Sequence, residues 1–217
     1  EETLTALRKC QSKGAEIAAV TSGGDLKRMC EENNYNHFII PGGNPPRTCL
    51  GYSLTGQLYI LVKYEILSKT VVEDLKSAIQ LLKTNDLAIQ QEAETVAENL
   101  LGRIPIVYAT DKFEPVSIRF RQQLNENSKE LCWHHKFPEL NHNEIVGWAS
   151  GNNNLSVVMF RNDDDYYRTQ ERMEFMKKVI LKKGSTVTEI VSKGSSFIEK
   201  VMYLICLTDW VSLFIAE

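Results

Sequence analysis

IPIVYA at residues 104–109 and LSVVMF at residues 155–160 are the two stretches that decide the fold. Short, continuous apolar runs of this kind are typical of parallel strands that are covered on both faces. VTEIV at residues 187–191 is a third run of the same type. Amphipathic segments at about 116–124, 163–182 and 195–215 follow the three runs, while residues 125–150 are expected to be irregular. This alternation predicts an α/β fold with a parallel sheet between helices.

The N-terminal part of the chain repeats the pattern on a smaller scale. Short apolar runs at residues 17–20 and 38–40 predict two further buried strands, and Asp25 is expected to cap the helix between them. Two strands are too few for a stable doubly wound sheet, so this first unit is expected to be incomplete on its N-terminal side. Residues 68–102 are predicted to form two connecting helices, separated near residue 85. The predicted organisation is therefore residues 1–67, a connection at 68–102, and a second domain at 103–217.

Composition excludes several classes of protein. Hydrophobic residues make up 43% and charged residues 24% of the 217 residues, which is typical of a globular chain. The net charge of −3 and the lack of a basic block argue against a nucleic-acid partner. No apolar run reaches the ~18–20 residues of a membrane span. Five cysteines without a CxxC pair indicate reduced thiols and a cytoplasmic location.

Ligands of parallel sheets bind beyond the carboxyl ends of the strands, and three irregular stretches are expected there. The first is PGGNPPR at residues 41–47, in which glycines and prolines restrict the backbone before Arg47. A fixed guanidinium suits a phosphate or a developing oxyanion. The alternative is an ordinary surface arginine.

The other two stretches contain candidate proton-transfer groups. In LNENSK at residues 124–129, two asparagines flank Glu126, and their amides could orient its carboxylate as a general base. In FPELNHNEIVGW at residues 137–148, Asn141 is expected to cap a short helix beside His142, which would be a proton-transfer group. The alternatives are a solvated helix end and a structural histidine. The adjacent pair at 134 and 135 lacks the spacing and the companions of a zinc site.

Two of these stretches resemble one family closely. PELNHNEIVGW at residues 138–148, preceded by NENSK at 125–129, resembles the hallmark of bifunctional phosphoglucose/phosphomannose isomerases, which contain two sugar-isomerase (SIS) domains. Further similar segments run in the same order along the chain: EET at 1–3, TSGG at 21–24, IPGG at 40–43, PR at 46–47, LGYS at 50–53 and residues 207–216. The resemblance implies two doubly wound parallel-sheet domains of the three-layer αβα type, the first of them incomplete in this chain.

The resemblance also implies a reaction. The family interconverts glucose 6-phosphate or mannose 6-phosphate with fructose 6-phosphate through a cis-enediolate, without a metal or cofactor, in glycolysis and gluconeogenesis. Glu126 would move the proton between C1 and C2, and Arg47 would stabilise the enediolate. His142 would assist ring opening in the site of a neighbouring subunit, so a homodimer with shared active sites is expected. The apolar set at residues 133–148 is compatible with an interface core, and packing within the domain is the alternative.

Departures from the family pattern limit this expectation. In that pattern the phosphate-binding serines and threonine precede Glu1, and an active-site lysine follows Glu217. The parent protein is therefore expected to be the isomerase, and this segment alone is expected to be inactive. A catalytically inactive SIS module that binds or senses sugar phosphates is the alternative. The isomerase half of a glucosamine-phosphate synthase is disfavoured, because the chain has no glutaminase signature. The retained Glu126, His142 and Arg47 favour the enzyme.

Overall fold

A computed structural model covers residues 1–217, and the chain divides into two compact units, Glu1–Glu73 and Asp74–Glu217. The first unit is a two-stranded parallel sheet with three helices. Its elements in chain order are α1 (Glu2–Ser12), β1 (Ala18–Thr21), α2 (Gly24–Glu32), β2 (Asn36–Ile39), a 3₁₀ turn (Pro46–Thr48) and α3 (Leu50–Lys63).

The strands of the first unit are less buried than predicted. Phe38 and Ile39 are 38% and 46% exposed, and most of β1 is half-buried, because a sheet of two strands offers little apolar surface to cover them. Helix α3 does approach the sheet closely at Gly56, where an added Cβ would lie 3.0 Å from the Phe38 ring. The cap of α2 also differs from the prediction. Gly23 occupies the N-cap position, and Asp25 in the first turn pairs with Arg28 at 2.9 Å.

Residues 68–102 were predicted to form two helices, and this is wrong: α4 (Thr70–Leu100) is one helix of 31 residues. No glycine or proline occurs near residue 85 to break it. Side chains there bond within the helix instead, since Gln80 Nε2 donates to Thr84 Oγ1 at 3.1 Å and Asn85 Nδ2 donates to the Leu81 carbonyl at 2.8 Å. The second half buries one apolar face, made by Ile89, Ala93, Val96, Ala97 and Leu100.

The second unit contains a four-stranded parallel sheet in the order β4-β3-β5-β6. Three strands match the predicted runs: β3 (Ile104–Thr110), β5 (Leu155–Arg161) and β6 (Thr186–Val191). The fourth, β4 (Trp133–Phe137), lies in the stretch predicted to be irregular, so that prediction is wrong. Its sequence WHHKF has no continuous apolar run, and such polar residues are tolerated because β4 is an edge strand, paired on one side only.

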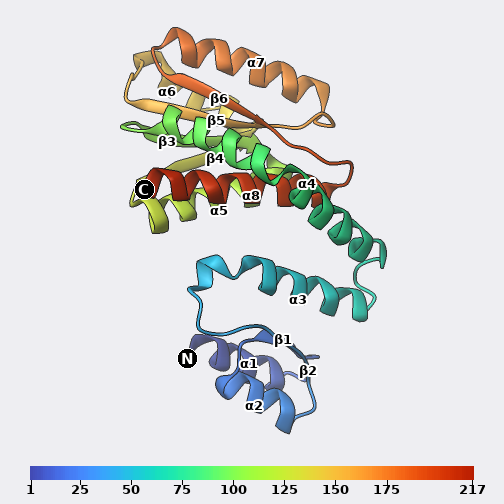
Figure 1. The fold of residues 1–217 in the computed structure, drawn as a ribbon. Coiled ribbons are helices and arrows are strands. Elements are labelled where there is room, and N and C mark those ends of the chain that lie inside the picture. The colour runs from blue at the N-terminus through green and yellow to red at the C-terminus, as the bar shows by residue number, and fades with distance from the viewer. The chain divides into compact units, whose positions relative to one another are not determined.

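Helices cover both faces of this sheet, which confirms the predicted three-layer αβα arrangement (Figure 1). On one face, Tyr108 and Met159 pack with Met173 and Met176 of α7 (Tyr167–Lys182). On the other face lie the second half of α4, α5 (Glu114–Gln123) and α8 (Phe197–Ala216), with the Phe120 ring 6.4 Å from the Phe160 ring. Adjacent residues of β5 thus point to opposite layers, as strand geometry requires.

The apolar set at residues 133–148 packs mainly inside its own unit. Phe137 and Leu140 are fully buried and Trp148 is 5% exposed, all three in the core cluster that includes Tyr108. The intradomain alternative therefore accounts for these residues, and their apolar character is no argument for an interface. The segment that carries them continues through a 3₁₀ turn (Glu139–Asn141) into the short helix α6 (Glu144–Gly147). None of the helices of the chain combines the length and apolarity needed to cross a membrane.

Candidate functional site

Glu126 lies on a π-helical turn, Leu124–Ser128, that continues directly from α5. Leu124 at its start is fully buried, whereas Glu126 is exposed. The turn ends at Lys129, which adopts a left-handed conformation (φ 61°), and the Glu130 amide donates back to the Leu124 carbonyl at 3.2 Å. One-turn π segments within helices often occur at functional sites.

The neighbouring asparagines anchor this turn. Asn125 Nδ2 donates to the Glu130 carbonyl at 2.6 Å, and Asn127 Nδ2 donates to Ser212 Oγ in α8 at 3.0 Å. Ser128 Oγ donates to the Ser212 carbonyl at 2.6 Å. These hydrogen bonds hold the backbone of the turn that presents the Glu126 carboxylate.

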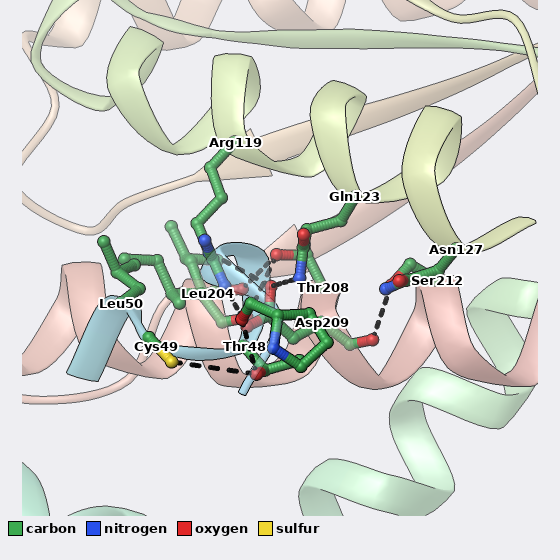
Figure 2. A network of polar contacts seen from close by, with 12 residues as sticks. Thr48, Cys49, Leu50, Arg119, Gln123, Asn127, Leu204, Thr208, Asp209 and Ser212 are labelled. Atoms are coloured by element: carbon green, nitrogen blue, oxygen red, sulfur yellow. Dashed lines mark hydrogen bonds and ion pairs between the residues drawn. The ribbon is translucent and has the colours of Figure 1, made fainter. Parts of the chain in front are cut away.

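A second set of contacts ties α5 to α8 one to two turns before Glu126 (Figure 2). Arg119 donates to both carboxylate oxygens of Asp209, from Nε at 3.1 Å and from Nη2 at 2.6 Å, and Gln123 Nε2 donates to the same carboxylate at 3.2 Å. Burial raises the pKa of Asp209, and the hydrogen bonds from Arg119 and Gln123 oppose this rise. The bidentate geometry fixes the relative position of the two helices more strictly than a lysine could.

The sequence predicts Glu126 at the carboxyl end of the sheet, and this is wrong. The connection from β3 to β4 starts at the carboxyl end of β3, and because the two strands are parallel it must finish at the amino end of β4. Glu126 follows α5 and precedes β4 in this connection, so it belongs to the amino side. The hydrogen bonds from the next two residues, Asn127 and Ser128, to Ser212 near the end of α8 agree with this, since α8 starts from the carboxyl end of β6.

His142 lies beyond the opposite end of β4. It is exposed, and its amide donates to the Glu139 carbonyl at 2.9 Å in the 3₁₀ turn that follows the strand. The predicted Asn141 cap is wrong, because Asn143 occupies the N-cap position of α6. The Asn141 Oδ1 atom is instead buried without a hydrogen-bond partner.

Arg47 lies in the first unit, within the 3₁₀ turn that follows the carboxyl end of β2. This is the edge predicted for its loop, and the turn after β1 lies there too, since a Cβ added to Gly42 would be 3.5 Å from Ser22 Cβ. The Thr48 amide and hydroxyl both donate to the Pro45 carbonyl, at 3.0 and 2.8 Å, which fixes the backbone on either side of Arg47. Arg47 is exposed, and it belongs to a different unit from Glu126 and His142.

A polar cluster surrounds Glu144, and no sequence pattern predicts it. Its Oε1 atom accepts from Tyr108 Oη at 2.5 Å and from Trp133 Nε1 at 3.2 Å, and Trp148 Nε1 donates to Tyr108 Oη at 3.1 Å. Burial is the largest cause of the raised pKa of the Tyr108 phenol, followed by its hydrogen bond to Glu144. The local sequence around Glu144 does not predict these hydrogen bonds, because its two partners, Trp133 and Tyr108, are 11 and 36 residues away along the chain.

Metal-ligating side chains do not gather anywhere in the chain in groups of three or more. His134 and His135 are consecutive residues of β4, so their side chains point to opposite faces of the sheet and cannot share an ion. Burial and the nearby Arg121 guanidinium lower the pKa of His134.

Comparison with known proteins gives a consistent result. Residues 89–217 match the family described as bacterial phospho-glucose isomerase C-terminal SIS domain. The whole chain is 34% identical to the bifunctional phosphoglucose/phosphomannose isomerase of Caldicellulosiruptor bescii and 31% identical to that of Aquifex aeolicus, covering 67% and 66% of their lengths. The chain thus spans about two thirds of these relatives.

Solved structures of low identity share the fold. The C-terminal domain of glucosamine-fructose-6-phosphate aminotransferase from Francisella tularensis superposes with a TM-score of 0.71 at 14% identity, over 99% of this chain and 67% of that one. At this identity the likeness concerns the fold alone, and it agrees with the SIS-type parallel sheet predicted from the sequence.

Proposed function

Since the chain belongs to the bifunctional phosphoglucose/phosphomannose isomerase family, we propose that it is part of an aldose–ketose isomerase acting on glucose 6-phosphate, mannose 6-phosphate and fructose 6-phosphate. The observation that carries the proposal is the turn at Glu126. Two hydrogen bonds tie this turn to α8, and a backbone held in this way would preorganise the exposed Glu126 carboxylate as a general base.

The proposed reaction moves one proton between two carbons. Glu126 removes the proton from C2 of the open-chain aldose, and the electron pair forms the C1–C2 double bond of a cis-enediolate. The negative charge develops on the oxygen of C1. Return of the proton to C1 and transfer of the hydroxyl proton from O2 to O1 give the ketose. No net oxidation occurs, so the scheme needs no redox cofactor.

Arg47 is proposed to stabilise the enediolate oxygen. A guanidinium presents several fixed donors to an anion, and preorganised donors of this kind lower the barrier most where charge develops. The support comes from the Arg47 backbone, which the Pro45 carbonyl holds through two hydrogen bonds from Thr48.

His142 is proposed to assist ring opening. Opening a pyranose requires a proton at the ring oxygen and removal of a proton from the anomeric hydroxyl, and an imidazole can serve both needs. This role can be separated from that of Glu126. A Glu126→Gln enzyme should still accelerate exchange between the two anomers of glucose 6-phosphate, and a His142→Ala enzyme should not.

The topology supports a site shared between two chains. Glu126 precedes the amino end of β4 and follows α5, on one face of the sheet. His142 follows the carboxyl end of β4 and leads into α6, whose neighbours Leu140 and Trp148 pack on the opposite face with α7. A sheet therefore lies between the two groups within one chain. This separation supports a site in which the His142 that meets the substrate comes from a partner, which a two-fold homodimer would supply.

We propose a cytoplasmic location for the enzyme on the basis of its thiols. All five cysteines are unpaired, as expected for a protein in a reducing compartment, and this supports a cytoplasmic enzyme.

Replacing Glu126 in the full-length enzyme tests the proposed function. Glu126→Gln keeps the size of the side chain and removes the base, so kcat should fall by several orders of magnitude while KM changes little. Gln122→Glu, an exposed position one turn earlier, serves as a control that should keep full activity. If Glu126→Gln retains more than about a tenth of the activity, Glu126 is not the base. If the wild-type enzyme binds sugar phosphates without isomerising them, the chain is a binding module instead.

A further inference from the structure

Four side chains from separate elements form a connected hydrogen-bond cluster beneath the segment that carries His142. Trp148 Nε1 donates to Tyr108 Oη, which donates to Glu144 Oε1, and Trp133 Nε1 donates to the same oxygen. His135 Nε2 lies 4.0 Å from the second carboxylate oxygen. The Glu144 carboxylate thus links the start of α6 to β3 and β4.

The cluster depends on Glu144 for its acceptor. Tyr108 is fully buried in the centre of the sheet. Its hydroxyl oxygen accepts the hydrogen bond from Trp148, so the hydroxyl proton needs a separate acceptor. Trp133 can only donate through its indole nitrogen. Removing the Glu144 side chain would leave two donors without their partner.

Packing alone does not hold Glu144 in place. A cavity of about 230 Å³ lies beside it, lined among others by Trp133, Trp148, Asn152 and Leu155. Side chains in a close-packed interior are confined by their neighbours, and the cavity removes that confinement from one side of Glu144. Hydrogen bonds must therefore supply the restraint on this side of the segment.

His142 lies between two anchors of the segment. Leu140, two residues earlier, is fully buried in the core, and Glu144, two residues later, is held by the cluster. His142 itself is exposed. Leu140 thus restrains the segment before His142, and Glu144 restrains it after His142 together with Ile145, which packs against the core; among these three, Glu144 supplies the polar restraint.

We propose that Glu144 is a positioning residue for His142: its carboxylate, bound by Tyr108 and Trp133, fixes the segment that presents the imidazole to the partner's sugar phosphate. The inference rests on the proposed function, because it gives His142 the ring-opening step. Proton transfer requires the imidazole within about 2.6–3.2 Å of the oxygen it serves, and a misplacement of 1 Å can cost about 100-fold in rate.

Kinetics of four variants of the full-length enzyme test the proposal. Glu144→Ala should lower kcat by about 10- to 100-fold with little change in KM, whereas Glu144→Gln, which keeps an oxygen acceptor for Tyr108 and Trp133, should retain most of the activity. The double variant His142→Ala/Glu144→Ala should be no slower than His142→Ala alone, because the second change can act only through the missing imidazole. Losses that multiply would show that Glu144 acts by another route and would overturn the proposal.

Hydrogen exchange supplies a measurement that does not depend on activity. Amides of residues 139–147 should exchange faster in Glu144→Ala than in wild type, and at the wild-type rate in Glu144→Gln. Tyr108→Phe removes one donor to Glu144 and leaves the carboxylate in place, so it should increase the exchange rate less than Glu144→Ala does. It serves as the test if the Glu144→Ala protein does not fold. Unchanged exchange in both Glu144→Ala and Tyr108→Phe would refute the positioning role. If amides 139–147 exchange faster in Glu144→Ala but His142→Ala is fully active, then Glu144 does hold the segment and the proposed role of His142 is refuted.

Discussion

Glu126 shows how a functional side chain is fixed by residues far away in the sequence. Its turn is bonded to Ser212 through Asn127 and Ser128, 84 to 85 residues along the chain. The motif around Glu126 was recognisable because acid and amide residues stand out locally. The partner in α8 was not, because a lone serine in an apolar helix has no pattern. Sequence thus identified the candidate groups and missed the contacts that hold them, including the entire cluster at Glu144.

Arg47 leads to a prediction about metal ions. Because the enediolate charge is assigned to its guanidinium, isomerisation by the full-length enzyme should survive exhaustive treatment with a chelator. The measurement is the rate of fructose 6-phosphate formation before and after dialysis against EDTA, with a zinc-dependent hydrolase treated in parallel as a control. Activity that disappears and returns with added zinc would mean that a Lewis acid, not Arg47, carries the charge.

At the scale of elements, the prediction succeeded where the sequence of a strand is apolar and failed where it is polar. The runs at 104–109 and 155–160 are central strands with neighbours on both sides, and both were found. Strand β4 was missed because WHHKF is an edge strand with polar side chains. The region of helix α4 was predicted as two helices because its second half is more polar than its first. No residue there interrupts a helix, and α4 is continuous.

Helix α8 begins with a capping box that gives a pH-dependent prediction. Glu199 Oε2 accepts from the amides of Ser195 and Ser196 at 2.9 and 2.7 Å, and these hydrogen bonds lower the pKa of Glu199. A carboxyl with a depressed folded-state pKa stabilises the fold above its unfolded-state pKa of about 4.3, and this contribution is lost as the pH falls through the folded-state value.

Glu199→Gln should therefore lower the free energy of unfolding at pH 7, and the difference from wild type should shrink on acidification below about pH 4. Ser196→Ala, which removes the other half of the box, should cost about 1 kcal/mol at either pH. Urea unfolding at the two pH values measures both effects. Glu171→Gln at an exposed position of α7 is the matched control. A difference for Glu199→Gln that does not depend on pH would contradict the assignment.

At the scale of the whole molecule, the fold class followed from the alternation of strands and helices, but the position of the site did not. The sequence predicted Glu126 at the carboxyl edge with the other candidates, because strand β4 was not recognised. Without β4, the pattern does not show that the chain returns to the amino side of the sheet before residue 133. With β4 in place, the separation of Glu126 from His142 becomes a physical reason for a shared site, which sequence supported only through a family resemblance.

Complementation measures whether the site is shared. Full-length Glu126→Gln and His142→Ala proteins, each inactive, should regain about a quarter of wild-type activity when mixed and reannealed. Random exchange makes half of the dimers mixed, and each mixed dimer has one intact site out of two. The matched control mixes Glu126→Gln with a Glu126→Ala protein, which can form no intact site. Absence of recovery, with exchange verified by native mass spectrometry, would show that both groups act within one chain.

The sheet between Glu126 and His142 also has a consequence for how the enzyme responds to dilution. Each folded chain would carry two half-sites and no complete one, so a correctly folded monomer would be inactive. Turnover per chain should then fall as the protein concentration drops below the dissociation constant of the dimer, although circular dichroism reports an unchanged fold. For such an enzyme, the number of working sites in a cell is set by mass action between chains as well as by the amount of protein.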